Sequence, residues 1–314
     1  MARGILLGDN WARRLATFNA ANSTVPSVGA LGWLTDYDCA LRAEFPSTTY
    51  VDFVLDFGSG NTARPNCCAV FNHNLFYAPD AAFDTTITVE SASNAAITTD
   101  VSVVGTATLN FTTGEPVWRA PYNTFIRLNL GTTTARRYFR IRIYDPYRDV
   151  QVEPIKVGQI FLGTARAPFA HNPATYISNP ALAVNYNYGL RQALEFSGYR
   201  SETIGGSLHA FDIAHRWRFD GVMFEGLAED DVRYLLDQFA GGGVNRLETH
   251  DGQGAATAIM PALLPLLWVP DADSLLCHYV LREGRDFPTV TPRVATRYDA
   301  GPFAFVEQAR GPVL

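Results

Sequence analysis

The stretch Val51-Asp-Phe-Val-Leu-Asp-Phe57 decides the fold class of this chain. Its odd-numbered residues are all apolar and share one face of an extended chain, whereas Asp52 and Asp56 fall on the other face. A period of two residues is typical of a β-strand with one buried face. Gly58-Ser-Gly60 follows and predicts the turn that ends the strand.

The same alternation recurs through the first half of the chain. Short apolar patterns, separated by turns rich in Gly, Asn and Thr, lie at 87–89, 101–103, 109–111, 126–130, 139–143 and 160–162. In the clearest of them Phe139, Ile141 and Ile143 alternate with Arg140, Arg142 and Tyr144. Many short strands, each with one solvent-exposed and one buried face, predict a mainly β protein built around an antiparallel jelly-roll sandwich.

The second half combines strands with one amphipathic helix. Residues 216–220 alternate like a strand, and short strands are expected near 263–269 and 276–281. A helix is predicted over 228–240, after the first of these strands. Acidic residues occupy its first turn, and Val232, Leu235, Leu236 and Phe239 form an apolar stripe along one side. The glycines at 241–243 end it.

A Pro- and Asn-rich stretch separates the halves. Pro168, Pro173 and Pro180 disfavour both a helix and a central strand there. We therefore expect a jelly-roll sandwich over 1–165, a connector over 166–190 and a smaller β domain with its helix over 191–314.

Composition indicates a globular protein and argues against several partners. The 314 residues are 47% apolar and 18% charged, with a net charge of −6. Arginines are scattered and Lys156 is the only lysine, so no basic stripe predicts a nucleic-acid partner. The apolar run 259–269 is too short to span a bilayer, and the N-terminus does not resemble a signal peptide.

Four cysteines occur, at positions 39, 67, 68 and 277. Adjacent Cys67 and Cys68 fit neither a disulfide framework nor a paired metal-binding motif. Reduced, mostly buried thiols are expected, which fits assembly in a cytoplasm.

The sequence carries few signals for catalysis or cofactors. Gly158 and Gly163 lack the Lys of a phosphate-binding loop, and no G-x-S-x-G motif is present. Two polar groupings could bind a metal but are more typical of ordinary turns and strands; they are His209, Asp212 and His215, and Glu248, His250 and Asp251. His73 and Asn74 could line a cleft, although a histidine that closes a strand end is favoured. We expect no enzyme activity, no metal and no cofactor.

Aromatic residues in or near the predicted loops are candidates for contact with a glycan or another protein. They are Trp118, Tyr122, Tyr144, Tyr147, Tyr186 and Tyr188. Tyrosine and tryptophan serve both sugar-binding platforms and protein interfaces, and the interface is favoured here.

Three motifs follow one another in the first half: Val70-Phe-Asn-His-Asn-Leu75, the strand 137–145, and a phrase ending in Gly158-Gln-Ile-Phe-Leu-Gly163. Together they resemble the galactose-binding-like (discoidin-type) jelly roll found in many phage virion proteins. In the second half, Gly205-Gly206, the strand Arg216-Trp217-Arg218-Phe219 and the helix after it resemble the belt domain of phage distal tail proteins. In those proteins the belt domain usually comes first, whereas here it follows the sandwich.

The resemblance implies a structural component of a phage tail tip or baseplate, made in the host cytoplasm. Copies would form a closed ring of three- or six-fold symmetry, with Arg216, Trp217, Arg218 and Phe219 at the ring interface. Other tail-tip, tail-tube or fibre proteins would be its partners. The alternative function is a carbohydrate-binding module that attaches the virus to a host surface glycan.

Overall fold

The computed structural model describes most of the first half and the strands of the second. The described residues are 5–36, 41–46, 50–75, 85–109, 124–131, 134–146, 154–166, 191–202, 208–227, 229, 232, 244–247, 255–259, 266–269, 278–283, 289–294 and 297–307. The fold is mainly β, as predicted, and no described helix is long and apolar enough to cross a membrane.

One layer of the first half is a five-stranded antiparallel sheet. Its strands, in spatial order, are β2 (Thr17–Phe18), β4 (Tyr50–Asp56), β9 (Tyr138–Tyr144), β6 (Thr85–Ala92) and β7 (Ser102–Leu109). Strand β9 lies in the middle and pairs along its whole length with β4 on one side and β6 on the other. It therefore holds the five-stranded sheet together.

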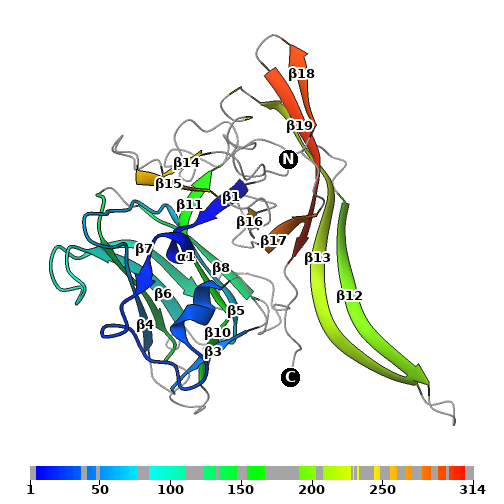
Figure 1. Ribbon diagram of the computed structural model, residues 1–314. Helices are drawn as coiled ribbons and strands as arrows, with labels where there is room; N and C mark the ends of the chain where they lie inside the picture. Colours follow the sequence, from blue (N-terminus) through cyan, green and yellow to red (C-terminus); the bar gives the residue numbers. More distant parts are fainter. Residues whose placement is uncertain are drawn as a thin grey trace.

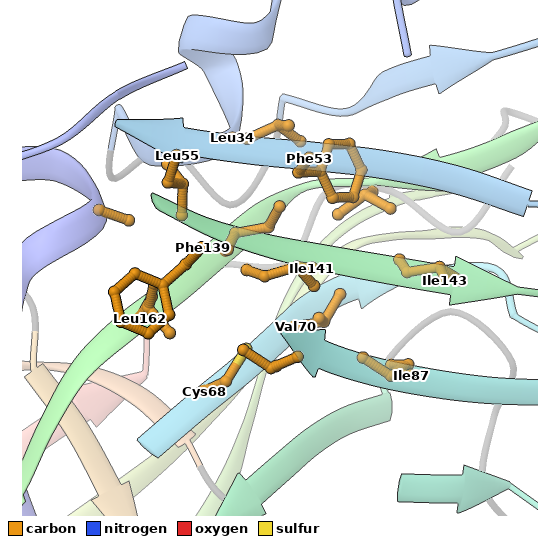
Figure 2. Close-up of a cluster of buried hydrophobic side chains, with 14 of the residues drawn as sticks. Leu34, Phe53, Leu55, Cys68, Val70, Ile87, Phe139, Ile141, Ile143 and Leu162 are labelled. Atoms are coloured by element: carbon orange, nitrogen blue, oxygen red, sulfur yellow. The ribbon is translucent and has the colours of Figure 1, made fainter. Parts of the chain in front are cut away.

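The predicted alternation is confirmed in this sheet. Burial follows a strict period of two in β9 and in most of β6, and Val51, Phe53 and Leu55 of β4 are fully buried. These side chains meet apolar residues of the facing layer in one core, which Figure 2 shows. Phe45 and Phe53 pack edge to face there, with ring centroids 5.1 Å apart.

The facing layer contains β1 (Ile5–Asn10), β11 (Gln159–Arg166), β5 (Cys67–His73) and β8 (Thr124–Asn129). The short pair β3 (Ala43–Phe45) and β10 (Ile155–Val157), the four-residue helix α1 (Trp11–Arg14) and the 3-10 turn η1 (Leu31–Thr35) pack at its margins. Their side chains complete the core with Ala43, Phe45, Ile155, Val157, Trp11, Ala12 and Leu34.

Strand β5 differs from the expectation that each strand has one solvent-exposed and one buried face. All seven of its residues are buried, and Phe161 of the adjacent β11 is also only 1% exposed. The side of β5 that faces away from the core carries Ala69 and Phe71, so it is covered as well. Continuous apolar runs such as Cys67-Cys-Ala-Val-Phe71 are typical of strands that are buried on both faces. Cys67 and Cys68 are buried thiols, as expected.

The second half continues the same layer. One ten-stranded sheet has the order β12-β13-β19-β17-β16-β1-β11-β5-β8, with β18 paired to β19. The strands of the second half are β12 (Arg191–Glu202), β13 (Leu208–Leu227), β16 (Leu266–Val269), β17 (His278–Glu283), β18 (Val290–Val294) and β19 (Arg297–Glu307), with β14 (Val244–Leu247) and β15 (Ala255–Ile259) as a separate pair. Strand β1 pairs with β11 on one side and with β16 on the other, so the first strand joins the two halves.

Most of the predicted helix 228–240 lies outside the described residues. Glu229 and Val232 are described, and both are helical. Val232 is buried in a second core together with Phe219, Phe224 and Phe305, as its place in the apolar stripe predicts. The predicted connector over 166–190 lies outside the described residues except for Arg166, the last residue of β11.

We predict that Ile141→Ala lowers the free energy of unfolding by about 2–5 kcal/mol, because it removes buried methyl groups and leaves a cavity in the core. Denaturant unfolding monitored by tryptophan fluorescence measures this cost. Val103→Ala, at a side chain that is 60% exposed in the same sheet, serves as the matched control and should cost less than about 0.5 kcal/mol. Equal costs for the two variants would contradict the assignment of the core.

Candidate recognition surfaces

The outer face of the five-stranded sheet carries a network of ion pairs. Arg142 donates two hydrogen bonds to the carboxylate of Asp52, both 2.7 Å long. Arg140 pairs with Glu90 on one side and reaches Asp52 at 3.9 Å on the other. These residues alternate with the buried ones of β4, β6 and β9, so the same period of two builds the core and the charged face.

A second ion pair, at one end of this face, lowers the pKa of an aspartate. Arg137 donates from Nε and Nη2 to the two carboxylate oxygens of Asp56, over 2.6 and 2.8 Å. These hydrogen bonds lower the pKa of Asp56 below its ordinary value, against the opposing effect of burial, and the backbone N–H of Gly58 lowers it further. Asp56 therefore stays ionised in the folded protein at lower pH than in the unfolded chain.

Two exposed tyrosines lie side by side at the opposite end of the face. Tyr50, the first residue of β4, pairs in register with Tyr144, the last residue of β9. Their exposed fractions are 51% and 41%, which is high for aromatic side chains. The guanidinium of Arg142 lies 4.9 Å from the centroid of the Tyr50 ring and thus links the tyrosines to the ion-pair network. We call Tyr50, Tyr144 and Arg142 the tyrosine site.

Only Tyr144 of the six predicted aromatic contact residues is described. Trp118, Tyr122, Tyr147, Tyr186 and Tyr188 lie outside the described residues. Tyr50 was not among the predicted residues, although a sequence signal for it existed. It stands two positions before Asp52, so strand alternation places it on the outer face with Asp52.

His73 and Asn74 serve the fold at the end of β5. The ring of His73 is fully buried, and its Nδ1 accepts a hydrogen bond of 3.2 Å from the backbone N–H of Leu75. Asn74 accepts a hydrogen bond from the Lys156 N–H and donates one to the Pro154 carbonyl, which fastens β10 to this strand end. The interpretation of His73 as a histidine that closes a strand end is confirmed.

Gly158 of the G-x-I-F-L-G phrase also has a structural role. A Cβ at this position would lie 2.8 Å from Cβ of Asn72, so only glycine fits where β10 turns into β11. Its N–H donates to the carbonyls of Phe71 and Asn72 across the bulge in β5.

Neither of the two polar groupings that could bind a metal gains support from the structure. Within the described ranges, no group of three or more His, Cys, Asp or Glu side chains could hold a metal ion. His209, Asp212 and His215 lie in β13, where a register shift opposite Ser197 and Gly198 leaves Ile213 as an extra residue. This bulge interrupts the strict two-residue alternation that would place positions 209 and 215 on one face of a regular strand. Glu248, His250 and Asp251 lie outside the described residues.

All four predicted ring-interface residues make contacts within the chain. Phe219 is 1% exposed in the second core, and Arg218 pairs with Asp220 and with Glu283 of β17. Trp217 packs partly buried against the same core. Arg216 pairs with Glu195 in the backbone register of β12 and β13. The ring interface stays a prediction.

A long two-stranded arm extends from the second half. Strands β12 and β13 pair over their full overlap, from Arg191 and Asp220 to Glu202 and Leu208, whereas β19 pairs with β13 only from Arg218 onward. The part of β13 from 208 to 217 and its partner residues in β12 therefore form a two-stranded ribbon among the described strands, seen as the curved pair in Figure 1. Such ribbons are marginally stable in water by themselves. We call this ribbon the arm.

Comparison with known proteins gives weak structural likeness only. No protein-family model matches the chain, and no curated protein matches it. The chain is similar to the family 32 carbohydrate-binding module of NanJ from C. perfringens, solved with galactose, at 9% identity and a TM-score of 0.33, covering 51% of this chain and 98% of that one. The lectin domain of lectinolysin, solved with Lewis B antigen, gives 11% identity, a TM-score of 0.32, and coverage of 50% and 98%.

A third structure shows that such neighbours are not all lectins. Reduced XRCC1 bound to the catalytic domain of DNA polymerase beta matches at 12% identity with a TM-score of 0.34, covering 51% of this chain and 98% of that one. At these identities and scores the likeness carries no argument about what the protein binds. The tail-tip identity stays a prediction.

We predict that the Asp56–Arg137 pair makes stability sensitive to acid. Because the folded-state pKa of Asp56 lies below the unfolded value of about 3.9, the pair's contribution is complete above that pH and is lost as the pH falls through the folded value. The gap in unfolding free energy between wild type and Asp56→Asn should therefore narrow from neutral pH to about pH 3. Denaturant titrations at each pH measure this gap. Arg137→Gln should show the same narrowing, and a gap that stays constant would contradict the linkage.

Proposed function

We propose that the protein is a non-enzymatic recognition protein whose sandwich binds carbohydrate at the tyrosine site. The observation that carries this proposal is the pair of exposed rings, Tyr50 and Tyr144, held in register beside the guanidinium of Arg142. Sugars present apolar C–H faces together with hydroxyl groups, so a recognition site needs aromatic surface next to polar donors and acceptors. The tyrosine site offers both on one rigid sheet.

The position of the site favours binding by preorganised side chains. Arg142 is fixed by its two hydrogen bonds to Asp52, and Asp52 is itself held through its backbone N–H, which donates to Thr24 Oγ1 over 2.9 Å. A ligand therefore meets side chains that lose little conformational freedom on binding.

The proposed carbohydrate binding predicts that Tyr144→Ala and Tyr50→Ala each weaken glycan binding at least about 10-fold, or ~1.4 kcal/mol, because each removes one ring of the platform. A glycan array identifies the ligand, and a titration with the best-bound glycan gives the affinities. Val103→Ala, at an exposed residue of the same sheet, is the matched control and should bind like wild type. A wild-type chain that binds no glycan, or tyrosine variants that bind normally, would exclude this function for the tyrosine site.

We propose as a second function that the protein is a structural part of a phage tail tip, where the sandwich would present its glycan site to the host. The specific observation in favour is the arm. A two-stranded ribbon gains stability by packing against another surface, and β12 has one edge that pairs with no other described strand. Edge-to-edge pairing between copies would cover this edge, and closure into a ring of three- or six-fold symmetry would limit the assembly.

The assembly proposal predicts that Ala193→Lys in β12 lowers the assembled mass to that of a monomer. Ala193 is exposed, and a lysine on an edge strand opposes pairing with another chain. Light scattering with negative-stain microscopy measures the mass and shows whether rings form. Val103→Lys, on the edge strand β7 of the other sheet, controls for added charge and should leave rings intact. Rings that persist in Ala193→Lys would rule out β12 as the joining edge.

A further inference from the structure

A polar cavity of about 280 Å³ lies at the end of the sandwich opposite the tyrosine site. It opens between the loop that joins β6 to β7 and the segment that precedes β9. Its lining includes Arg136, Asp100, Ser91, Ser102, Thr134 and Val101. Small-molecule sites begin at roughly 300 Å³, so the cavity has the size of a site for one small ligand.

Arg136 brings a guanidinium group to the wall of the cavity. Its Nε is buried and has no hydrogen-bond partner among the residues that the structure describes. The backbone at Arg136 is fixed on both sides, because its N–H donates to the Ala63 carbonyl over 3.1 Å and its carbonyl accepts from the Ala63 N–H over 2.8 Å. Buried N–H groups are nearly always paired, so an unpaired guanidinium donor at a cavity favours an acceptor that comes from a ligand.

The loop between β6 and β7 holds a carboxylate at the cavity in place. Asn94 Oδ1 accepts from the Thr98 N–H over 3.0 Å, and Ile97 buries its side chain in a small cluster, so the loop has a fixed shape. At the end of the loop, Ser93 Oγ donates to Oδ2 of Asp100 over 3.1 Å. Asp100 itself adopts a positive φ of 52°, a conformation that non-glycine residues rarely take. The loop thus holds a carboxylate at the cavity that Arg136 also lines.

We propose that this cavity binds a small hydroxylated carboxylate of the acidic-monosaccharide type. Arginine pairs with carboxylates through two parallel N–H groups, and the unused Nε of Arg136 is one member of such a fork. Asp100 accepts from ligand hydroxyl groups, and the hydroxyls of Ser102 and Thr134 donate or accept as the ligand requires. Val101, which is 43% exposed at the rim, suits the apolar face of a sugar ring.

This site is separate from the tyrosine site in both place and residues. Arg136 precedes the start of β9, and Tyr144 ends it. A strand rises ~3.3 Å per residue, so eight residues place the two sites roughly 25 Å apart. The cavity proposal therefore does not rest on the tyrosine site, and either can fail without the other.

The test is a ligand-observed NMR titration of the full chain with glucuronate. Saturable binding is expected, and Arg136→Gln should weaken it at least about 10-fold because the charge-assisted pair is lost. Asp100→Asn should also weaken glucuronate binding, because an amide replaces the accepting carboxylate. Glucose, which has the hydroxyl groups without the carboxylate, should bind at least about 10-fold more weakly than glucuronate.

Two further variants keep the result specific. Arg297→Gln, at an exposed arginine on β19, is the control and should bind glucuronate like wild type. Ser102→Ala, at an exposed position on the cavity wall, should weaken glucuronate binding, because it removes a hydroxyl group of the cavity and preserves every buried group. The proposal is overturned if glucuronate does not bind saturably, if Arg136→Gln binds it normally in a folded chain, or if acetate binds as tightly as glucuronate.

Discussion

The alternation of side chains along β9 is the constraint on which the rest of the sandwich depends. Phe139, Ile141 and Ile143 point into the core and are fully buried, whereas Arg140 and Arg142 point outward into ion pairs. A shift of one residue in the pairing of β9 would reverse both sets at once, exposing the apolar residues and burying the arginines. Because a buried unpaired charge costs several kcal/mol, only one register satisfies both faces. This register also places both candidate sites, since Tyr144 ends the strand and Arg136 precedes it.

Sequence reasoning predicted the parts of the fold that follow from local periodicity. The period of two at 51–57 and 139–143 correctly predicted one buried face in each strand, because a buried face leaves a pattern within the strand's own sequence. It did not predict the burial of Val54 on the other face of β4. The burial of both faces of β5 was only partly predictable from the sequence. A continuous apolar run indicates that a segment is buried, but it does not indicate which other segments pack against its two faces. The bulge at Ile213 could not be foreseen, because it depends on how β12 and β13 pair.

The candidate sites depend on contacts between distant residues, and this explains why sequence reasoning found them only partly. Tyr144 was predicted as an aromatic contact residue, but its neighbour Tyr50 lies 94 positions earlier and meets it only through the pairing of β4 with β9. The cavity draws Ser91, Asp100 and Arg136 from three segments, and none of these belongs to a recognisable motif. Ordinary polar residues become a site only when the fold brings them together.

The two halves of the chain are not independent sheets. Because β1 pairs with both β11 and β16, the strand that opens the described chain lies between the sandwich and the sheet that carries the arm. Backbone hydrogen bonds across β1 fix the relation of these two sheet regions within the described strands. A recognition site on the sandwich and an assembly surface on the arm would then be held in a defined orientation.

The central claim is that the sandwich recognises carbohydrate at the tyrosine site. A crystal structure of the full chain with its best-bound array glycan tests this claim most directly, because it shows where the ligand lies. We expect a sugar ring stacked on Tyr50 or Tyr144, with at least one hydroxyl group within hydrogen-bonding distance of Arg142. A glycan bound elsewhere on the chain, with both tyrosines still open to solvent, would contradict it.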